Sequence, residues 1–175
     1  MKRILIASAL VAMAIASVNA ATVTWQATGQ TDSDGAALNG AIAYLFNTAD
    51  VSVSDVSSAL EDGTFLDANG VASKALASKA STATGGFAMA GIGSFENETV
   101  ELFMVVFDGD SATSDNVKIS GTYSQNFAKS NKTYNFNTRL ASATWSPNPM
   151  AVPEPTTVAL LALGLAALGL KRKVA

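Results

Sequence analysis

The strongest strand signal in the sequence is Thr99-Val100-Glu101-Leu102-Phe103-Met104-Val105-Val106-Phe107. β-Branched and aromatic residues dominate this stretch, and they favour extended backbone. Its last six residues are all apolar. A strand with one solvent-facing side would alternate apolar and polar residues, so both faces of this strand are expected to be covered. The stretch therefore predicts a strand buried inside a domain.

Shorter strand signals lie on both sides of this stretch. Residues 22–27 alternate, which places Val23, Trp25 and Ala27 on one face. Residues 71–80 are ambiguous, because Ala and Lys favour a helix whereas the flanking glycines favour a strand between turns. Further strands are expected at 41–46, 87–92, 117–123, 133–138 and 141–145. Seven or eight strands at such short intervals predict an all-β fold, as a single antiparallel β-sandwich or jelly-roll-like domain.

One short helix is expected at 54–63. Ser54 can cap its N-terminus, Asp55 suits the positive end of the helix dipole, and Gly63 can end it. The buried stripe of this helix would be Val56, Ala59 and Leu60.

The composition narrows the possible chemistry. The 175 residues include no cysteine and no histidine, which excludes a disulfide framework, a thiolate nucleophile, a Ser-His-Asp triad and most zinc or copper sites. Residues 21–150 hold six basic and thirteen acidic side chains, a net charge of −7. This charge argues against nucleic acid as a partner, because phosphate binding needs clustered Lys and Arg.

The first twenty residues are typical of a secretory signal peptide. Lys2 and Arg3 supply its positive start, and residues 4–18 form an uncharged, mostly apolar run. A small residue, Ala20, ends it, so we expect signal peptidase to cleave between Ala20 and Ala21. The alternative is an N-terminal membrane anchor, but fifteen residues are short of the roughly 20 that a spanning helix needs.

The other end of the sequence carries a proline-rich segment. Residues 146–150, Ser-Pro-Asn-Pro-Met, read as a spacer that is neither regular helix nor central strand. Two prolines, Pro153 and Pro155, then flank Glu154 and favour an extended, exposed backbone. An enzyme that reads an extended peptide benefits from this stiffness, because less conformational entropy is lost on binding.

A short apolar helix and a basic cluster are expected to follow. Residues 156–170 are uncharged and rich in Ala and Leu, and as a helix they would span about 22 Å, short of a roughly 30 Å hydrocarbon core. Snorkelling of the basic side chains can accommodate the difference, and these side chains should remain cytoplasmic. The predicted membrane-helix residues are Thr157, Leu160, Leu163, Leu165, Leu168 and Leu170, and the basic residues are Lys171, Arg172 and Lys173.

The combination of Pro-Glu-Pro, short apolar helix and basic end resembles the PEP-CTERM protein-sorting domain, over about residues 151–175. This resemblance implies sorting by an exosortase, an integral-membrane transpeptidase-like enzyme, in Gram-negative bacteria that make exopolysaccharide. It says nothing of the domain that precedes it. The implied recognition motif is Val152, Pro153, Glu154 and Pro155.

Four segments are therefore expected along the chain. They are a signal peptide at 1–20, a β-sandwich passenger at 21–146, a Pro-rich linker with the sorting motif at 147–156, and a transmembrane helix with a basic tail at 157–175.

Two Asp-rich turns are candidates for calcium. One combines Asp108, Asp110 and Asp115, and the other combines Asp32 and Asp34. Neither has the spacing of an EF-hand loop, and Asp-rich turns commonly serve only as Asx-turns. We therefore predict no metal site and no cofactor.

Carboxylates and aromatic rings suggest two further alternatives. Paired acids can hydrolyse glycosides, but no spacing here selects a pair from Glu61, Asp62, Glu96, Glu98, Glu101, Asp108 and Asp110. A sugar-stacking platform would need exposed rings from Trp25, Tyr44, Tyr123, Tyr134 and Trp145.

The sequence as a whole predicts an exported, non-enzymatic surface or matrix protein. Its expected partners are signal peptidase, an exosortase-type processing enzyme, the inner membrane as a transient anchor, and extracellular polysaccharide. The alternatives are a carbohydrate-binding adhesin and, less favoured, a small glycan-active enzyme.

Overall fold

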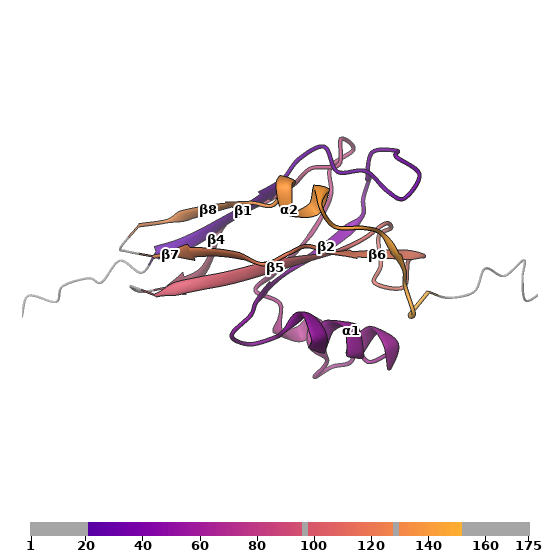
Figure 1. The fold of residues 1–175 in the computed structure, drawn as a ribbon, viewed down its shortest axis with the longest axis horizontal. Coiled ribbons are helices and arrows are strands. Elements are labelled where there is room, and N and C mark those ends of the chain that lie inside the picture. The colour runs from indigo at the N-terminus through magenta and orange to yellow at the C-terminus, as the bar shows by residue number, and fades with distance from the viewer. Residues whose placement is uncertain (1–20, 96–97, 128–129, 152–175) are drawn as a thin grey trace, which may run out of the picture.

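The computed structural model describes residues 21–95, 98–127 and 130–151 (Figure 1). The chain is mostly β-sheet, as predicted. Its strands are β1 (Ala21–Ala27), β2 (Ile42–Asn47), β3 (Ala77–Ala80), β4 (Phe87–Phe95), β5 (Thr99–Phe107), β6 (Asn116–Ile119), β7 (Tyr123–Asn126), β8 (Lys132–Asn135) and β9 (Ser146–Pro147). Its helices are α1 (Val53–Glu61), the 3₁₀ helix η1 (Val71–Lys74) and α2 (Asn137–Ala141).

The strands form two sheets. A three-stranded sheet has the order β4-β1-β8, and a six-stranded sheet has the order β3-β2-β5-β6-β9, with β7 also paired to β5. All pairings are antiparallel except that of β1 with β8, in which Trp25 lies opposite Tyr134. The prediction of an entirely antiparallel domain is therefore wrong at this one pairing.

The parallel pair of β1 and β8 is closed at both ends by asparagine side chains. The backbone N–H of Thr22 donates to Asn131 Oδ1 at 2.9 Å, and that of Thr28 donates to Asn137 Oδ1 at 2.7 Å. These bonds satisfy backbone donors at the points where the ladder stops.

The strand predicted to be covered on both faces is β5, and this prediction is confirmed. On one face, Val100, Leu102, Met104 and Val106 join a cluster that also contains buried side chains of the three-stranded sheet. On the other face, Phe103, Val105 and Phe107 join a second cluster with α1. We call these the inter-sheet cluster and the helix-side cluster. Figure 1 shows the resulting layers, with the three-stranded sheet above β5 and α1 below it.

Helix α1 is built as the sequence suggested, but its N-cap is different. Ser52, not Ser54, is the N-cap: Ser52 Oγ accepts from the N–H of Asp55 at 3.1 Å, and the Asp55 carboxylate accepts from the N–H of Ser52 at 2.8 Å. This reciprocal pair satisfies two free donors of the first turn. The predicted stripe of Val56, Ala59 and Leu60 is buried.

A second helix, α2, lies where strands were expected at 133–138 and 141–145, so these boundaries and the prediction of only one helix are wrong. The strand ends at Asn135, whose Oδ1 accepts from the N–H of Asn137 at 3.0 Å. Asparagine side chains compete in this way with a strand ladder. A helical turn also buries Phe136 and Leu140 together, since residues four apart share one face of a helix.

The ambiguous stretch at 71–80 contains both structures, with η1 followed by β3. The predicted signal helix and membrane helix lie outside the described residues. Within residues 21–151, apart from the two short gaps, no helix combines the length and apolarity needed to cross a membrane.

Candidate functional site

The predicted recognition motif, Val152–Pro155, lies outside the described residues, as do the predicted membrane helix, the basic cluster at 171–173 and Ala20. The structure does describe the residue that follows the predicted signal cleavage point, Ala21, and the residue that precedes the motif, Ala151. The two ends of the described chain lie on opposite sides of the domain along its long axis (Figure 1).

The first described residue is already part of the fold. Ala21 begins β1, lies opposite Phe95 of β4 and is buried. The residue that follows the predicted cleavage point is therefore part of the folded domain.

The segment before the sorting motif is held against the domain in two steps. The first step is strand β9, in which Ser146 pairs with Val117 and Pro147 pairs with Asn116. Proline is compatible with this position because β9 lies at the edge of its sheet.

The second step is Asn148, which is only 5% exposed. Its side-chain amide donates to the carbonyl oxygens of Ala112 at 2.8 Å and Ser114 at 2.7 Å. Its backbone N–H donates to the carbonyl oxygen of Asp115 at 2.8 Å. One residue therefore satisfies three carbonyl groups of the loop between β5 and β6.

The same asparagine also holds the residues that follow it. Asn148 Oδ1 accepts from the N–H of Met150 at 3.1 Å, and its carbonyl oxygen accepts from the N–H of Ala151 at 3.0 Å. The side chain of Met150 packs against the helix-side cluster. The residues of the predicted spacer that the structure describes are thus docked on the domain.

Sequence reasoning missed the role of Asn148. The segment 146–150 has no helical or strand periodicity. Its sequence therefore gives no way to distinguish a buried polar side chain from an exposed one. The one available signal was an amide residue between two prolines, Pro147 and Pro149. Because proline has no backbone N–H, neither neighbour can donate a hydrogen bond to the amide oxygen of Asn148.

A pocket of about 440 Å³ lies beside this docked segment. Leu60 of α1 and Val117 and Ile119 of β6 contribute large apolar side chains to its lining, beside smaller apolar residues, hydroxyl groups and one carboxylate. The remaining lining residues are Ser57, Glu61, Ser142, Ala143, Thr144, Ser146, Pro147 and Pro149.

The five aromatic side chains considered for sugar stacking do not form an exposed platform. Trp25 and Tyr134 are fully buried, and Tyr134 Oη donates to the carbonyl oxygen of Val100 at 2.7 Å. Burial raises the pKa of the Tyr134 hydroxyl to about 12. Tyr44 packs on the helix-side cluster, and Tyr123 packs on the inter-sheet cluster.

Trp145, the fifth of these aromatic residues, is half-buried and already engaged. Its indole N–H donates to the carbonyl oxygen of Thr31 at 3.1 Å. The ammonium group of Lys118 lies 4.6 Å from the centre of its ring, and burial lowers the pKa of this lysine. The ring therefore ties the segment before β9 to two other parts of the domain.

The two Asp-rich turns use their carboxylates to close loops. Asp32 Oδ1 accepts from the N–H groups of Asp34 and Ala36, each at 2.9 Å. Asp108 accepts from the backbone and side-chain amides of Asn116 at 3.0 and 2.6 Å. The bond from the N–H of Asp34 to Asp32 is that of an Asx-turn. Asp108 instead binds a residue eight positions later and ties together the two ends of the loop between β5 and β6.

The other acidic candidates are dispersed over several elements. Glu61 and Asp62 lie at the end of α1, Glu98 lies just before β5, and Glu101 Oε2 accepts from Thr48 Oγ1 at 3.3 Å. Glu96 lies outside the described residues. Among the described residues, no three His, Cys, Asp or Glu side chains are grouped closely enough to hold a metal ion.

Comparison with known proteins identifies the C-terminal segment. The model of the PEP-CTERM protein-sorting motif matches residues 151–173, beginning at the residue whose N–H is bound to Asn148. No curated protein and no solved structure matches the chain. A tail with this motif marks proteins that an exosortase-type enzyme processes during export through the membrane to the surface of Gram-negative bacteria. The chain is a PEP-CTERM sorting-domain-containing protein.

Proposed function

We propose that this chain is a non-enzymatic surface or extracellular-matrix protein associated with exopolysaccharide. The observation that carries the proposal is the direct junction of a folded β domain, whose described residues are held in place as far as Ala151, with a sorting motif that starts at the same residue. The tail would direct the protein to the cell surface, and the folded domain would be the part that is exported.

The proposal includes two processing events. Signal peptidase would remove residues 1–20 and leave Ala21, a buried residue of β1, as the first residue of the mature protein. Residues 157–170 would anchor the chain transiently in the inner membrane until the exosortase-type enzyme acts at Val152–Pro155. The intact mass of the mature protein would report both events.

The delivered domain is, in this proposal, a β-sandwich. Support comes from the inter-sheet cluster, in which Trp25 of β1, Tyr134 of β8 and Leu102 of β5 are all buried. Asp32 and Asp108 of its Asp-rich turns are engaged in loop closure, and its aromatic rings are engaged in packing. A role as an inert structural component suits a domain whose reactive side chains are used in this way.

The sorting motif can be tested by replacing Pro153 and Pro155 with alanine together. We expect this variant to keep its C-terminal segment and to remain in the membrane fraction, because alanine removes the stiff extended backbone that the enzyme reads. The control is Ser94→Ala, an exposed change on β4 that should leave processing unaltered. Normal release of the double-proline variant from the cell would overturn the sorting role.

The structural role can be separated from the adhesin alternative by a polysaccharide pull-down with the processed protein. Tyr134 is buried, so the informative variant is Trp145→Ala. Under our proposal, the association with exopolysaccharide is residence in the matrix and not binding at a site, so neither the wild type nor this variant shows saturable binding to a defined glycan. Saturable binding that Trp145→Ala abolishes would instead establish an adhesin.

A further inference from the structure

The docked segment leaves almost no free chain ahead of the recognition motif. Asn148 makes five hydrogen bonds within the domain and to Met150 and Ala151. Val152 is then the only residue between the last docked residue and Pro153. A motif tethered so closely emerges from one fixed point on the domain.

We propose that Asn148 is a positioning residue for the processing of the sorting motif. By holding Pro149, Met150 and Ala151 against the domain, it presents the motif to the exosortase-type enzyme on a short, preordered tether. This inference rests on the proposed function, since it concerns the same reaction.

The physical basis is the cost of ordering a mobile chain. Without the Asn148 side chain, residues 148–151 lose three hydrogen bonds, two of them to the loop between β5 and β6. The backbone bond to Asp115 and the packing of Met150 remain, so the segment is loosened. Four loosened residues can span about 13 Å, and an enzyme that binds the motif must then order them. Each newly ordered residue lowers the affinity of binding.

The upstream contacts remain when Asn148 is changed, so the effect of such a change is local. Trp145 keeps its hydrogen bond to Thr31 and its contact with Lys118. Strand β9 keeps its pairing with β6 through Ser146 and Pro147. Pro147 would then be the last residue that keeps all of its contacts with the domain.

Three full-length variants test the inference, with processing measured on membranes that contain the enzyme. The first is Asn148→Ala. The second combines Asn148→Ala with deletion of residues 149–151, which removes the loosened chain. The third leaves every domain residue unchanged and inserts four Gly/Ser residues between Ala151 and Val152.

We expect Asn148→Ala and the insertion each to raise the KM for processing about tenfold while kcat stays within about twofold, because ordering is a cost of binding and not of chemistry. The deletion should restore KM to within about threefold of the wild-type value. Rescue by shortening distinguishes positioning from a loss of folding, because a deletion does not repair a destabilised domain.

Several results would overturn the inference. It is overturned by an unchanged KM in Asn148→Ala or in the insertion variant, by faster processing after the insertion, or by no rescue after the deletion. In each case, normal processing of the wild type leaves the proposed function intact. A wild-type chain that the enzyme does not process at all would instead refute the proposed function, and this inference with it.

Discussion

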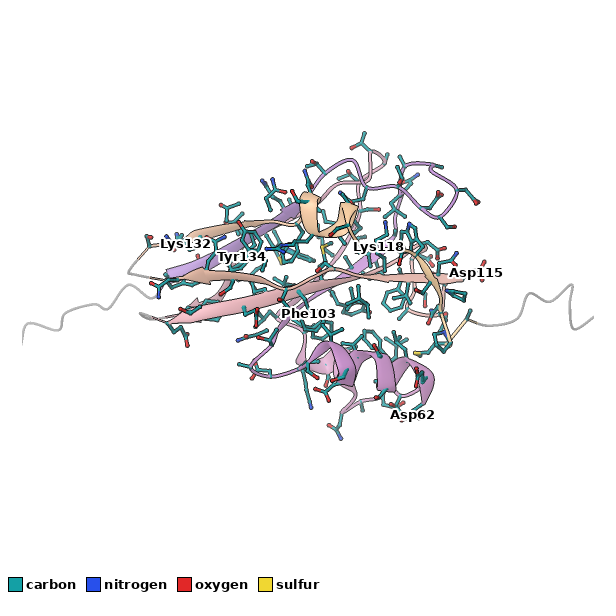
Figure 2. The ribbon with its side chains drawn as sticks, in the orientation of Figure 1. Asp62, Phe103, Asp115, Lys118, Lys132 and Tyr134 are labelled. Carbon is teal, nitrogen blue, oxygen red and sulfur yellow. The ribbon has the colours of Figure 1, made fainter. Side chains whose placement is uncertain are left out.

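The hydroxyl of Tyr134 donates a hydrogen bond of 2.7 Å to the carbonyl oxygen of Val100 and so joins the two sheets. Tyr134 belongs to β8 of the three-stranded sheet, and Val100 belongs to β5 of the six-stranded sheet. Figure 2 shows Tyr134 beneath β8, on the side that faces the other sheet. The inter-sheet cluster thus contains a directional bond between its two layers. Among the described residues, the buried indole N–H of Trp25 in the same cluster has no hydrogen-bond partner.

Removal of this hydroxyl should weaken the domain. Tyr134→Phe leaves the Val100 carbonyl without its buried donor, and we expect the free energy of unfolding to fall by about 1–3 kcal/mol. Urea denaturation at neutral pH measures this change. Tyr123→Phe is the matched control, because its ring packs 5.0 Å from that of Tyr134 and is half-buried. Equal stability of Tyr134→Phe and wild type would show that the bond contributes nothing net.

The same tyrosine should make stability depend on alkaline pH. The pKa of its hydroxyl is about 12 in the folded protein, whereas the ordinary pKa of a tyrosine hydroxyl is 10.0. The unfolded chain therefore loses the proton first. The stabilisation is complete below pH 10 and is lost as the pH rises from about 10 to 12. Thermal melts across this range should show a smaller fall in Tm for Tyr134→Phe than for wild type. Parallel curves for the two proteins would contradict this assignment.

The covered faces of β5 predict a large effect of core truncation. Phe103 is fully buried in the helix-side cluster, with its ring centre 5.4 Å from that of Phe46, and Figure 2 places it on the α1 side of β5. Phe103→Ala should lower the free energy of unfolding by about 3–5 kcal/mol. The control is Leu66→Ala, since Leu66 is 47% exposed and should change stability by less than about 0.5 kcal/mol. A similar small loss in both variants would show that α1 does not cover this face in solution.

The position of the N-cap gives a prediction in which the two candidate serines serve as test and control. Ser52→Ala should cost about 1 kcal/mol, because it removes the acceptor for the Asp55 N–H. Ser54→Ala should cost less, since Ser54 lies inside the first turn. Chemical denaturation of the two variants measures the difference, and the reverse order would place the helix start at Ser54.

The cap should also lose strength in acid. The side-chain hydrogen bond from Ser52 lowers the pKa of the Asp55 carboxyl below 3.8, the ordinary value for an aspartate. A carboxyl whose folded pKa is lowered contributes stability that is present above its unfolded pKa and is lost as the pH falls through the folded value. The stability difference between wild type and Ser52→Ala should therefore shrink below about pH 4. A constant difference down to pH 2 would contradict this role of the carboxylate.

Two glycines with positive φ allow the stability cost of backbone strain to be compared with the cost of a steric clash. Gly85 has φ +70°, and a Cβ there would collide with the backbone of Gln30; Gly35 has φ +86° and open space around it. Gly35→Ala should cost about 1–2 kcal/mol from the left-handed conformation alone. Gly85→Ala should cost more, because the Gln30 backbone must also move. Equal losses in the two variants, measured by thermal unfolding, would show that the turn at Gly85 adapts freely.

Local patterns in the sequence were sufficient for some features of this protein. The apolar run that ends at Phe107 already required cover on both faces, because burial of consecutive side chains leaves no solvent-facing side. The stripe of Val56, Ala59 and Leu60 followed from helical spacing in the same way. The sorting motif could also be read directly, since the pattern of Pro153, Glu154 and Pro155 is recognised without reference to the packing of the rest of the chain.

Other features depended on contacts between residues far apart in the chain. The parallel pairing of Trp25 with Tyr134 joins residues 109 positions apart, and nothing in either segment specifies its partner. Asn148 was read as part of a spacer because its partners, Ala112 and Ser114, lie more than thirty residues away. Periodicity and composition indicate which side chains of one segment are buried and which are exposed to solvent. Which other segment it packs against is decided only when the whole domain folds.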